Sequence, residues 1–175
     1  MIKTILSLFV AQASAADPPS TPPPSPPQCE GEKYEAFDFW VGEWDVYPNS
    51  SEGEAAKVAD SSIEKVSAGC AIRETWMPLQ GRGGTSLSAY DPKTEGWHQL
   101  WVGGTPGRTF FDGGAVEGKM VLTGQWGKAQ DGTPLLVRMT YSLQDDGSVR
   151  QHGQASKDQG LTSVDYFDLI YRRKE

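Results

Sequence analysis

The sequence predicts an all-β protein whose single domain closes into an up-and-down antiparallel barrel of about ten strands. Short runs of alternating apolar and polar residues recur along the chain, with no amphipathic helix of normal length between them. Twenty of the 175 residues are glycine, which favours many tight turns over long helices. Hairpin-linked strands leave two bare sheet edges, and closure into a barrel removes them. A two-sheet sandwich is the alternative.

The chain before the predicted barrel is not expected to join it. Residues 1–15, MIKTILSLFVAQASA, combine a lysine, a short apolar run and small residues at Ala13 and Ala15, as in a secretory signal peptide. Residues 16–28 hold seven of the twelve prolines and are predicted to form a disordered linker, because proline fixes φ and has no N–H to donate. We therefore expect an exported protein, periplasmic or extracellular, with one domain over residues 29–175. No run approaches the ~18 apolar residues of a membrane-spanning helix.

The two cysteines, Cys29 and Cys70, fit this prediction of export. Disulfides form and persist in oxidising compartments. A bond between them would join the start of the domain to its middle, and we predict that bond. Two free thiols are the alternative.

The ten expected strands follow one another closely in the sequence. In chain order the runs are 42–48 (GEWDVYP), 57–66 (KVADSSIEKV), 70–78 (CAIRETWMP), 85–91 (TSLSAYD), 97–104 (WHQLWVGG), 108–114 (RTFFDGG), 119–126 (KMVLTGQW), 135–143 (LLVRMTYSL), 148–156 (SVRQHGQAS) and 164–173 (VDYFDLIYRR). Asp-Gly pairs at Gly132 and Gly147 supply the positive φ that tight hairpins need. The segment DPKTEG, residues 91–96, is a third turn signal.

One turn carries a motif that needs a separate interpretation. Residues 156–163, SKDQGLTS, match most of the Asp-box pattern S-x-D-x-G-x-T-W, with Ser163 in place of the aromatic residue. In sialidases this box is a structural turn far from catalysis. We predict a turn between the last two strands, with Asp158 accepting hydrogen bonds from backbone N–H groups and Gly160 at positive φ.

The aromatic stretch FDFWVGEWDV, residues 37–46, is expected to cross the closed end of the barrel and to begin the first strand. Its Gly42-x-Trp44 pattern, with Arg172 and Arg173 on the last strand, resembles the calycin superfamily, which includes the lipocalins. In those barrels an arginine stacks on the tryptophan at the closed end. A planar guanidinium suits that role because it can stack while its N–H groups bond carbonyls. An ordinary core tryptophan and two solvated arginines are the alternative.

A wider resemblance covers nearly all of the chain after Cys29. The segments FDFWVGEWDV, GCAIRETW, SLSAYDPKTEGWHQLWV, GKMVLTG, VRMTYSLQDDGSVRQ and FDLIYRR together resemble an uncharacterised family of exported bacterial domains that carry an FDFWxGEW signature. This resemblance implies a calycin-like or lipocalin-like barrel and export. It implies no activity.

The alternation of side chains along the strands predicts a candidate site inside the barrel. Trp97, Gln99 and Trp101 share one strand face, as do Glu74 and Trp76. A one-residue slip inverts a face, so one strand cannot tell which side points inward. Aromatic walls with a few convergent polar groups are typical of small-molecule sites. The lining residues we predict are Glu74, Trp76, Trp97, Gln99, Trp101, Arg138 and Arg150. Tryptophans that serve only as core or as an outer girdle are the alternative.

The expected function is the binding of a small apolar or aromatic organic ligand in this lumen. One alternative is a small lyase or isomerase in which Glu74 transfers a proton and Arg138 or His152 stabilises an anion. A barrel filled by side chains, with a structural or interaction role, is another. The enzyme alternative draws only on fold analogy and on the carboxylate in an aromatic lumen.

Composition argues against several other partners. The formal net charge of −7 disfavours nucleic acid, because an acidic surface repels phosphate backbones. The only histidines are His98 and His152, and neither lies in a haem attachment motif. A metal site usually needs three clustered N, O or S ligands. We therefore expect no haem, no other cofactor and no metal.

Overall fold

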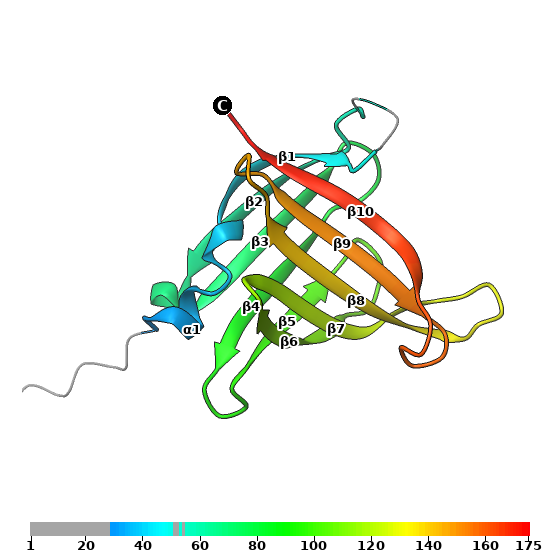
Figure 1. The fold of residues 1–175 in the computed structure, drawn as a ribbon. Helices are drawn as coiled ribbons and strands as arrows, with labels where there is room; N and C mark the ends of the chain where they lie inside the picture. Colours follow the sequence, from blue (N-terminus) through cyan, green and yellow to red (C-terminus); the bar gives the residue numbers. More distant parts are fainter. Residues whose placement is uncertain (1–28, 51–52, 54) are drawn as a thin grey trace, which may run out of the picture.

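A computed structural model describes residues 29–50, 53 and 55–175, and in it the chain forms a closed ten-stranded barrel (Figure 1). Each strand pairs antiparallel with its neighbours in the sequence, and β1 closes the barrel by pairing with β10. The predicted all-β, up-and-down architecture is confirmed. The predicted signal peptide and linker, residues 1–15 and 16–28, lie outside the described residues.

The strand ends differ from the predicted runs by at most two residues. The strands are β1 (Gly42–Pro48), β2 (Ala59–Val66), β3 (Ala71–Pro78), β4 (Gly84–Asp91), β5 (Gly96–Val102), β6 (Thr109–Val116), β7 (Lys119–Lys128), β8 (Pro134–Leu143), β9 (Val149–Ser156) and β10 (Val164–Arg173). Three short helical segments accompany them: α1 (Glu32–Glu35), η1 (Asp38–Trp40) and η2 (Ser67–Gly69). None of the described helices has the length and apolar character needed to cross a membrane.

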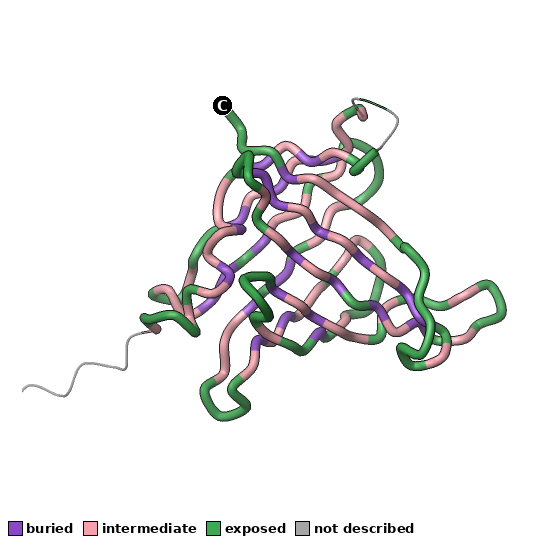
Figure 2. Tube along the Cα trace, viewed as in Figure 1, coloured by how far each residue is buried: buried purple, intermediate pink, exposed green. Residues whose placement is uncertain are grey.

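Buried residues alternate with more exposed ones along β2, β8 and β9, and Figure 2 shows buried segments recurring along the strands of the barrel wall. On β8, for example, Val137, Met139 and Tyr141 are buried, whereas Arg138 between them is exposed. Side chains of successive strand residues point to opposite faces, so the buried set marks the inside of the closed sheet.

The segment that contains α1 and η1 plugs one end of the barrel. Phe37 and Trp40 are fully buried, and their rings stack with centroids 4.9 Å apart. Phe37 and Trp40 also contact Tyr141 of β8, at 4.9 and 4.8 Å, and Phe37 meets Trp97 of β5 at 5.8 Å. The predicted disulfide between Cys29 and Cys70 is present and ties the start of this plug to the beginning of β3.

The predicted closure of the plugged end is confirmed for one of the two arginines. The Arg173 guanidinium lies over the Trp44 ring at 4.6 Å, and its Nη2 donates to the Val41 carbonyl at 3.4 Å. Trp44 is fully buried and donates its indole N–H to the Trp40 carbonyl at 2.9 Å. Gly42 has a φ of 153°, and a Cβ there would lie only 2.6 Å from Arg173 Nη1, so a larger residue would be strained and would displace the guanidinium from its place over Trp44.

Arg172 points to the opposite side of the sheet from Arg173, as strand alternation requires. It is exposed, and its guanidinium lies 4.8 Å from the Tyr47 ring. The prediction left the choice between the two arginines open, and the register of β10 against β1 decides it, because Arg173 is the residue opposite Trp44.

The Asp-box segment forms the predicted turn between β9 and β10. Asp158 Oδ1 accepts a hydrogen bond from the Thr162 backbone N–H at 2.8 Å, and Ser156 Oγ accepts one from the Gly160 N–H at 2.7 Å. Gly160 has a φ of 93°, in the left-handed region. The motif therefore stabilises a loop at the end of the barrel opposite the plug, where the β1–β2, β3–β4, β5–β6 and β7–β8 connections also lie.

Candidate functional site

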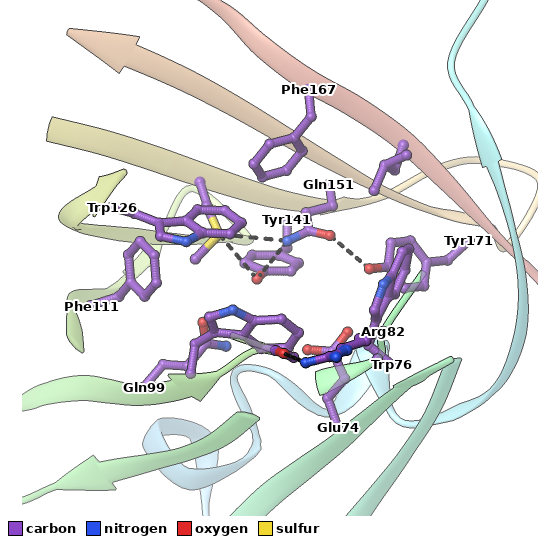
Figure 3. A pocket seen from close by; sticks show the side chains of 15 residues that line it. Glu74, Trp76, Arg82, Gln99, Phe111, Trp126, Tyr141, Gln151, Phe167 and Tyr171 are labelled. Atoms are coloured by element: carbon purple, nitrogen blue, oxygen red, sulfur yellow. Dashed lines mark hydrogen bonds between the residues drawn. The ribbon is translucent and has the colours of Figure 1, made fainter. Parts of the chain in front are cut away.

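The unplugged half of the barrel contains a cavity of about 230 Å³ (Figure 3). It is larger than the roughly 150 Å³ cavity that holds benzene in an engineered protein core, and smaller than the ~300 Å³ at which drug-sized sites begin. The space suits a small ring compound. The lining residues are Glu74, Trp76, Arg82, Gly83, Gln99, Trp101, Gly104, Phe111, Trp126, Met139, Tyr141, Gln151, Phe167, Leu169 and Tyr171.

Aromatic rings form much of the cavity wall, in two groups. Trp126 is the centre of the first, with ring centroids 6.4 Å from Trp101, 6.0 Å from Phe111 and 5.9 Å from Phe167. Trp76 and Tyr171, 6.3 Å apart, form the second. Figure 3 shows Trp126, Phe111 and Phe167 on a different side of the cavity from Trp76 and Tyr171. Flat apolar faces of this kind suit an aromatic or other ring-shaped ligand.

Glycines on neighbouring strands make room for two of these rings. A Cβ at Gly153 of β9 would lie 2.3 Å from the Phe167 ring, and a Cβ at Gly84 of β4 would lie 2.5 Å from the Trp101 ring. Gly153 is also the register partner of Phe167, next to a bulge in β10. The side chain missing at each glycine therefore lets a large ring lie flat against the wall, as bulges and strand glycines often do.

Glu74 is the one carboxyl group among the described residues that line the cavity. It is only 5% exposed, and its two oxygens accept hydrogen bonds from Ser61 Oγ at 3.3 Å and Ser86 Oγ at 3.0 Å. Burial raises the pKa of Glu74 to about 7, because desolvation penalises the charged form more than hydrogen bonds from Ser86, Ser61 and Tyr171 stabilise it. This carboxyl can therefore exist in either protonation state near neutral pH.

A second polar group is centred on Gln151 of β9. Its Nε2 donates to the Tyr141 hydroxyl at 2.9 Å, and its Oε1 accepts from the Tyr171 hydroxyl at 2.7 Å. Burial raises the pKa of both tyrosines, and the nearby Glu74 carboxyl adds to the effect, so both phenols stay neutral. Gln99 donates to Ser88 Oγ at 3.0 Å. The cavity is thus apolar at its walls and hydrogen-bonded at a few fixed points.

Four of the seven predicted lining residues meet in this cavity: Glu74, Trp76, Gln99 and Trp101. Trp97 also points into the barrel, but it lies nearer the plug and is part of the filled core. Its ring packs against Phe37, and its indole N–H donates to the Lys33 carbonyl at 3.1 Å. The plug therefore covers Trp97, which does not line the cavity.

The predicted places of Arg138 and Arg150 in the lumen are wrong. Arg138 is exposed on the outer face of β8, because its neighbours Val137 and Met139 point inward. Arg150 is on the outer face of β9, where it forms a two-pronged ion pair with Asp168, Nε to Oδ1 at 2.8 Å and Nη2 to Oδ2 at 2.6 Å. Both errors come from choosing the wrong face of an alternating strand.

Most of the lining residues that were not predicted from the sequence lie on β6 to β10, and the others, Arg82, Gly83 and Gly104, lie in the β3–β4 and β5–β6 connections. The apolar face of β8 was visible in the alternation of Met139 with Tyr141, and it marks the inside of that strand. The inward direction of Gln151 then follows from the pairing of β9 with β8, because Gln151 is opposite Tyr141. Other missed lining residues are Arg82, Phe111, Trp126, Phe167, Leu169 and Tyr171.

Neither histidine faces the lumen. His98 Nδ1 lies 2.6 Å from Asp112 Oδ1, and His152 Nε2 lies 2.8 Å from Asp165 Oδ1, in both cases on the outside of the barrel. His152 is therefore not placed to stabilise an anion beside Glu74. Within residues 29–50, 53 and 55–175, no three His, Cys, Asp or Glu side chains cluster in a way that suits a metal ion.

Comparisons with known proteins bring no relative. No protein-family model matches the chain, and no curated protein matches it. The resemblance to exported FDFWxGEW domains therefore stays a prediction.

Proposed function

We propose that this protein is an exported binding protein that holds a small apolar or aromatic compound in the lumen of its barrel. The observation that carries the proposal is the cavity of about 230 Å³, walled by Trp76, Trp101 and Trp126 at the end that the plug leaves open. Concave, mostly aromatic sites with a few polar groups are the usual form of small-molecule sites.

Native mass spectrometry of the protein purified from its own host, together with calorimetric titration with small aromatic compounds, tests this proposal. Met139 lines the cavity, so Met139→Trp should fill it and abolish saturable binding. Leu143→Trp is the matched control, because Leu143 belongs to the same strand but is 55% exposed. Equal binding by both variants, or no binding by the wild-type protein, would contradict a ligand in the lumen.

Export is supported by the Cys29–Cys70 disulfide, since such bonds persist in oxidising compartments. The proposed location is the periplasm or the extracellular medium. Fractionation of the host, with non-reducing mass spectrometry of the recovered protein, tests it. Recovery in the cytoplasm with both thiols free would refute the location.

Proton-transfer catalysis in the same cavity is the second candidate function. It is favoured by Glu74, a buried carboxyl in the cavity wall whose pKa is raised to about 7. A group that titrates near neutral pH can both accept and return a proton. The discriminating measurement is deuterium uptake from D₂O into the carbon framework of a compound that co-purifies with the protein. Uptake that Glu74→Gln abolishes would indicate an enzyme, and an undeuterated bound compound would indicate binding alone.

A further inference from the structure

We propose that the lumen selects small ring compounds that carry a protonated amine, with the ammonium group bound at Glu74. This inference rests on the proposed function, because it needs a ligand in the cavity. It adds the chemical class of that ligand, and its first support is the distribution of charge around Glu74.

The lumen holds a carboxyl group without a fixed counter-charge. Among the described residues, no salt bridge joins Glu74, and the hydrogen bonds that stabilise its charged form come from the neutral hydroxyls of Ser61, Ser86 and Tyr171. The described cavity lining contains one cationic side chain, Arg82. Arg82 is exposed, and its Nη1 donates to the Gly104 carbonyl at 3.2 Å. A buried carboxylate is costly unless it is paired, so a cationic ligand would supply the missing partner.

The carboxylate keeps room for further donors. An ionised carboxylate offers about four lone-pair positions. Ser61 takes one position on Oε1 and Ser86 one on Oε2. An ammonium group carries three N–H donors, and bonds between two charged groups are shorter and stronger than neutral ones. Glu74 can therefore accept an ammonium without losing either serine.

The rings around Glu74 favour a cation as well. Trp76 lies two residues along the same strand face of β3, and Tyr171 closes the same side of the cavity (Figure 3). The face of an aromatic ring attracts a cation, most strongly when water is excluded. The Trp126 group on the other side then accommodates the apolar ring of the ligand. One small molecule with an ammonium at one end and a ring at the other satisfies both parts.

Anionic and neutral ligands fit the surroundings of Glu74 less well than an ammonium does. An anionic ligand would bring a like charge towards Glu74, and Arg82 at the cavity's exposed margin is the one described lining cation to offset it. A neutral ligand would leave Glu74 either protonated or ionised without a counter-charge. The other titratable groups that face Glu74 are the phenols of Tyr141 and Tyr171, whose pKa values are raised, so they stay neutral over the range tested below.

Three probes of nearly equal size and different charge test the inference by isothermal titration calorimetry: 2-phenylethylamine, 2-phenylethanol and phenylacetate. At pH 8, above the pKa of about 7 for Glu74, the amine should bind on the order of tenfold or more tighter than the alcohol, since a charged partner strengthens a hydrogen bond. Phenylacetate should bind weakest. At pH 5.5 the amine should lose this advantage, because Glu74 is then protonated.

Glu74→Gln provides the matched change in the protein, because it removes the charge and keeps the shape. It should weaken amine binding at pH 8 on the order of tenfold. The alcohol should be affected little. Glu64→Gln is the control variant, because Glu64 is an exposed carboxylate that pairs with Arg73 on the outside of the barrel. The pH series on the wild-type protein needs no variant, so the inference stays testable if Glu74→Gln folds poorly.

Each result has one meaning. Amine preference that disappears at low pH and in Glu74→Gln supports the inference. Equal affinity for amine and alcohol at pH 8, or amine binding that does not change with pH, overturns amine selection and leaves lumen binding intact. Failure of all three probes to bind overturns the amine inference and also counts against the proposed function.

Discussion

The two ends of the barrel are both rich in aromatic side chains, yet only one of them is filled. At the plugged end, Phe37, Trp40 and Trp44 are fully buried, and the chain before β1 supplies the rings of Phe37 and Trp40. At the open end, Trp101 and Trp126 are partly exposed and surround a cavity. Aromatic content therefore does not separate core from site in this protein. What separates them is whether another part of the chain covers the rings.

The hydrogen-bond partners of the polar side chains also differ between the two ends of the barrel. At the plugged end, the indole N–H groups of Trp44 and Trp97 donate to backbone carbonyls of Trp40 and Lys33, which fixes the plug in place. At the open end, Glu74 and Gln151 bond mainly to other side chains. Carboxyl and amide groups with remaining hydrogen-bonding capacity can exchange partners with a ligand. One end is thus filled by the chain itself, whereas the other keeps unused hydrogen-bonding capacity beside a cavity.

The largest expected effect is at the plugged end. Trp44→Ala should lower the free energy of unfolding by about 3–5 kcal/mol, because it leaves a void in a closed core. Trp101→Ala at the open end should cost only roughly 1–2 kcal/mol, since that ring is partly exposed and already borders a cavity. Urea unfolding followed by circular dichroism measures both. Equal costs would mean that the two ends do not differ in packing.

The next effect concerns Glu74 at the open end. Its pKa of about 7 in the folded protein exceeds the ordinary 4.5, so the folded state binds the proton more tightly than the unfolded state. This contribution to stability is present below pH 4.5 and is lost as the pH rises through 7. The loss amounts to ~3 kcal/mol. Glu74→Gln has no proton to lose here, so it should not show this loss of stability. The variant should therefore become more stable relative to wild type as the pH rises from 4.5 to 8.

Urea unfolding at several pH values measures this difference, with Glu64→Gln as the control. Glu64 is exposed, so its substitution should not alter the pH dependence in the same way. A constant difference between Glu74→Gln and wild type across the pH range would show that the cavity does not perturb this carboxyl.

A smaller effect is expected where a glycine makes room for a ring of the cavity wall. Gly153→Ala should destabilise the protein by about 1–3 kcal/mol through overpacking against Phe167. Gly114→Ala is the matched control on β6, because a Cβ there meets nothing within 4 Å. Thermal melts compare the two, and ligand titration reports whether a displaced Phe167 ring changes the cavity. A cost at Gly114 equal to that at Gly153 would refute the packing explanation.

The smallest effect compares one cation–ring contact at each end. Arg173→Lys keeps the charge but loses the planar stacking on buried Trp44, and it should cost roughly 0.5–1 kcal/mol. Arg108→Lys at the open end changes a contact with exposed Phe110, at 5.4 Å, and should cost less. Urea unfolding of both variants tests the ranking, and the reverse order would indicate that Arg173 does not stabilise the closed end.

Local pattern predicted much of the fold. The ten runs, the turns at Gly132 and Gly147 and the Gly42–Trp44 signature depend on residues close together in the sequence, so they could be read directly. Whether Arg138 and Arg150 point into or out of the barrel could not be predicted in this way. Alternation assigns residues to two faces, but the choice of the inner face depends on the neighbouring strands. On β8 and β9 the residues predicted to line the lumen came from the faces that carry arginine. The faces that point inward are the apolar face of β8 and the face of β9 that carries Gln151.

The sequence by itself determined the strands, their turns, the disulfide partners and the Gly42–Trp44 signature of the closed end, because alternation, turn chemistry and two cysteines are local or unambiguous signals. Only the tertiary structure decided which of the two arginines stacks on Trp44, which aromatic rings are covered by the plug, and that Glu74, Gln151 and Tyr171 line one cavity. These residues come from strands far apart in the chain, and they come together only when β10 returns to β1 and the sheet closes.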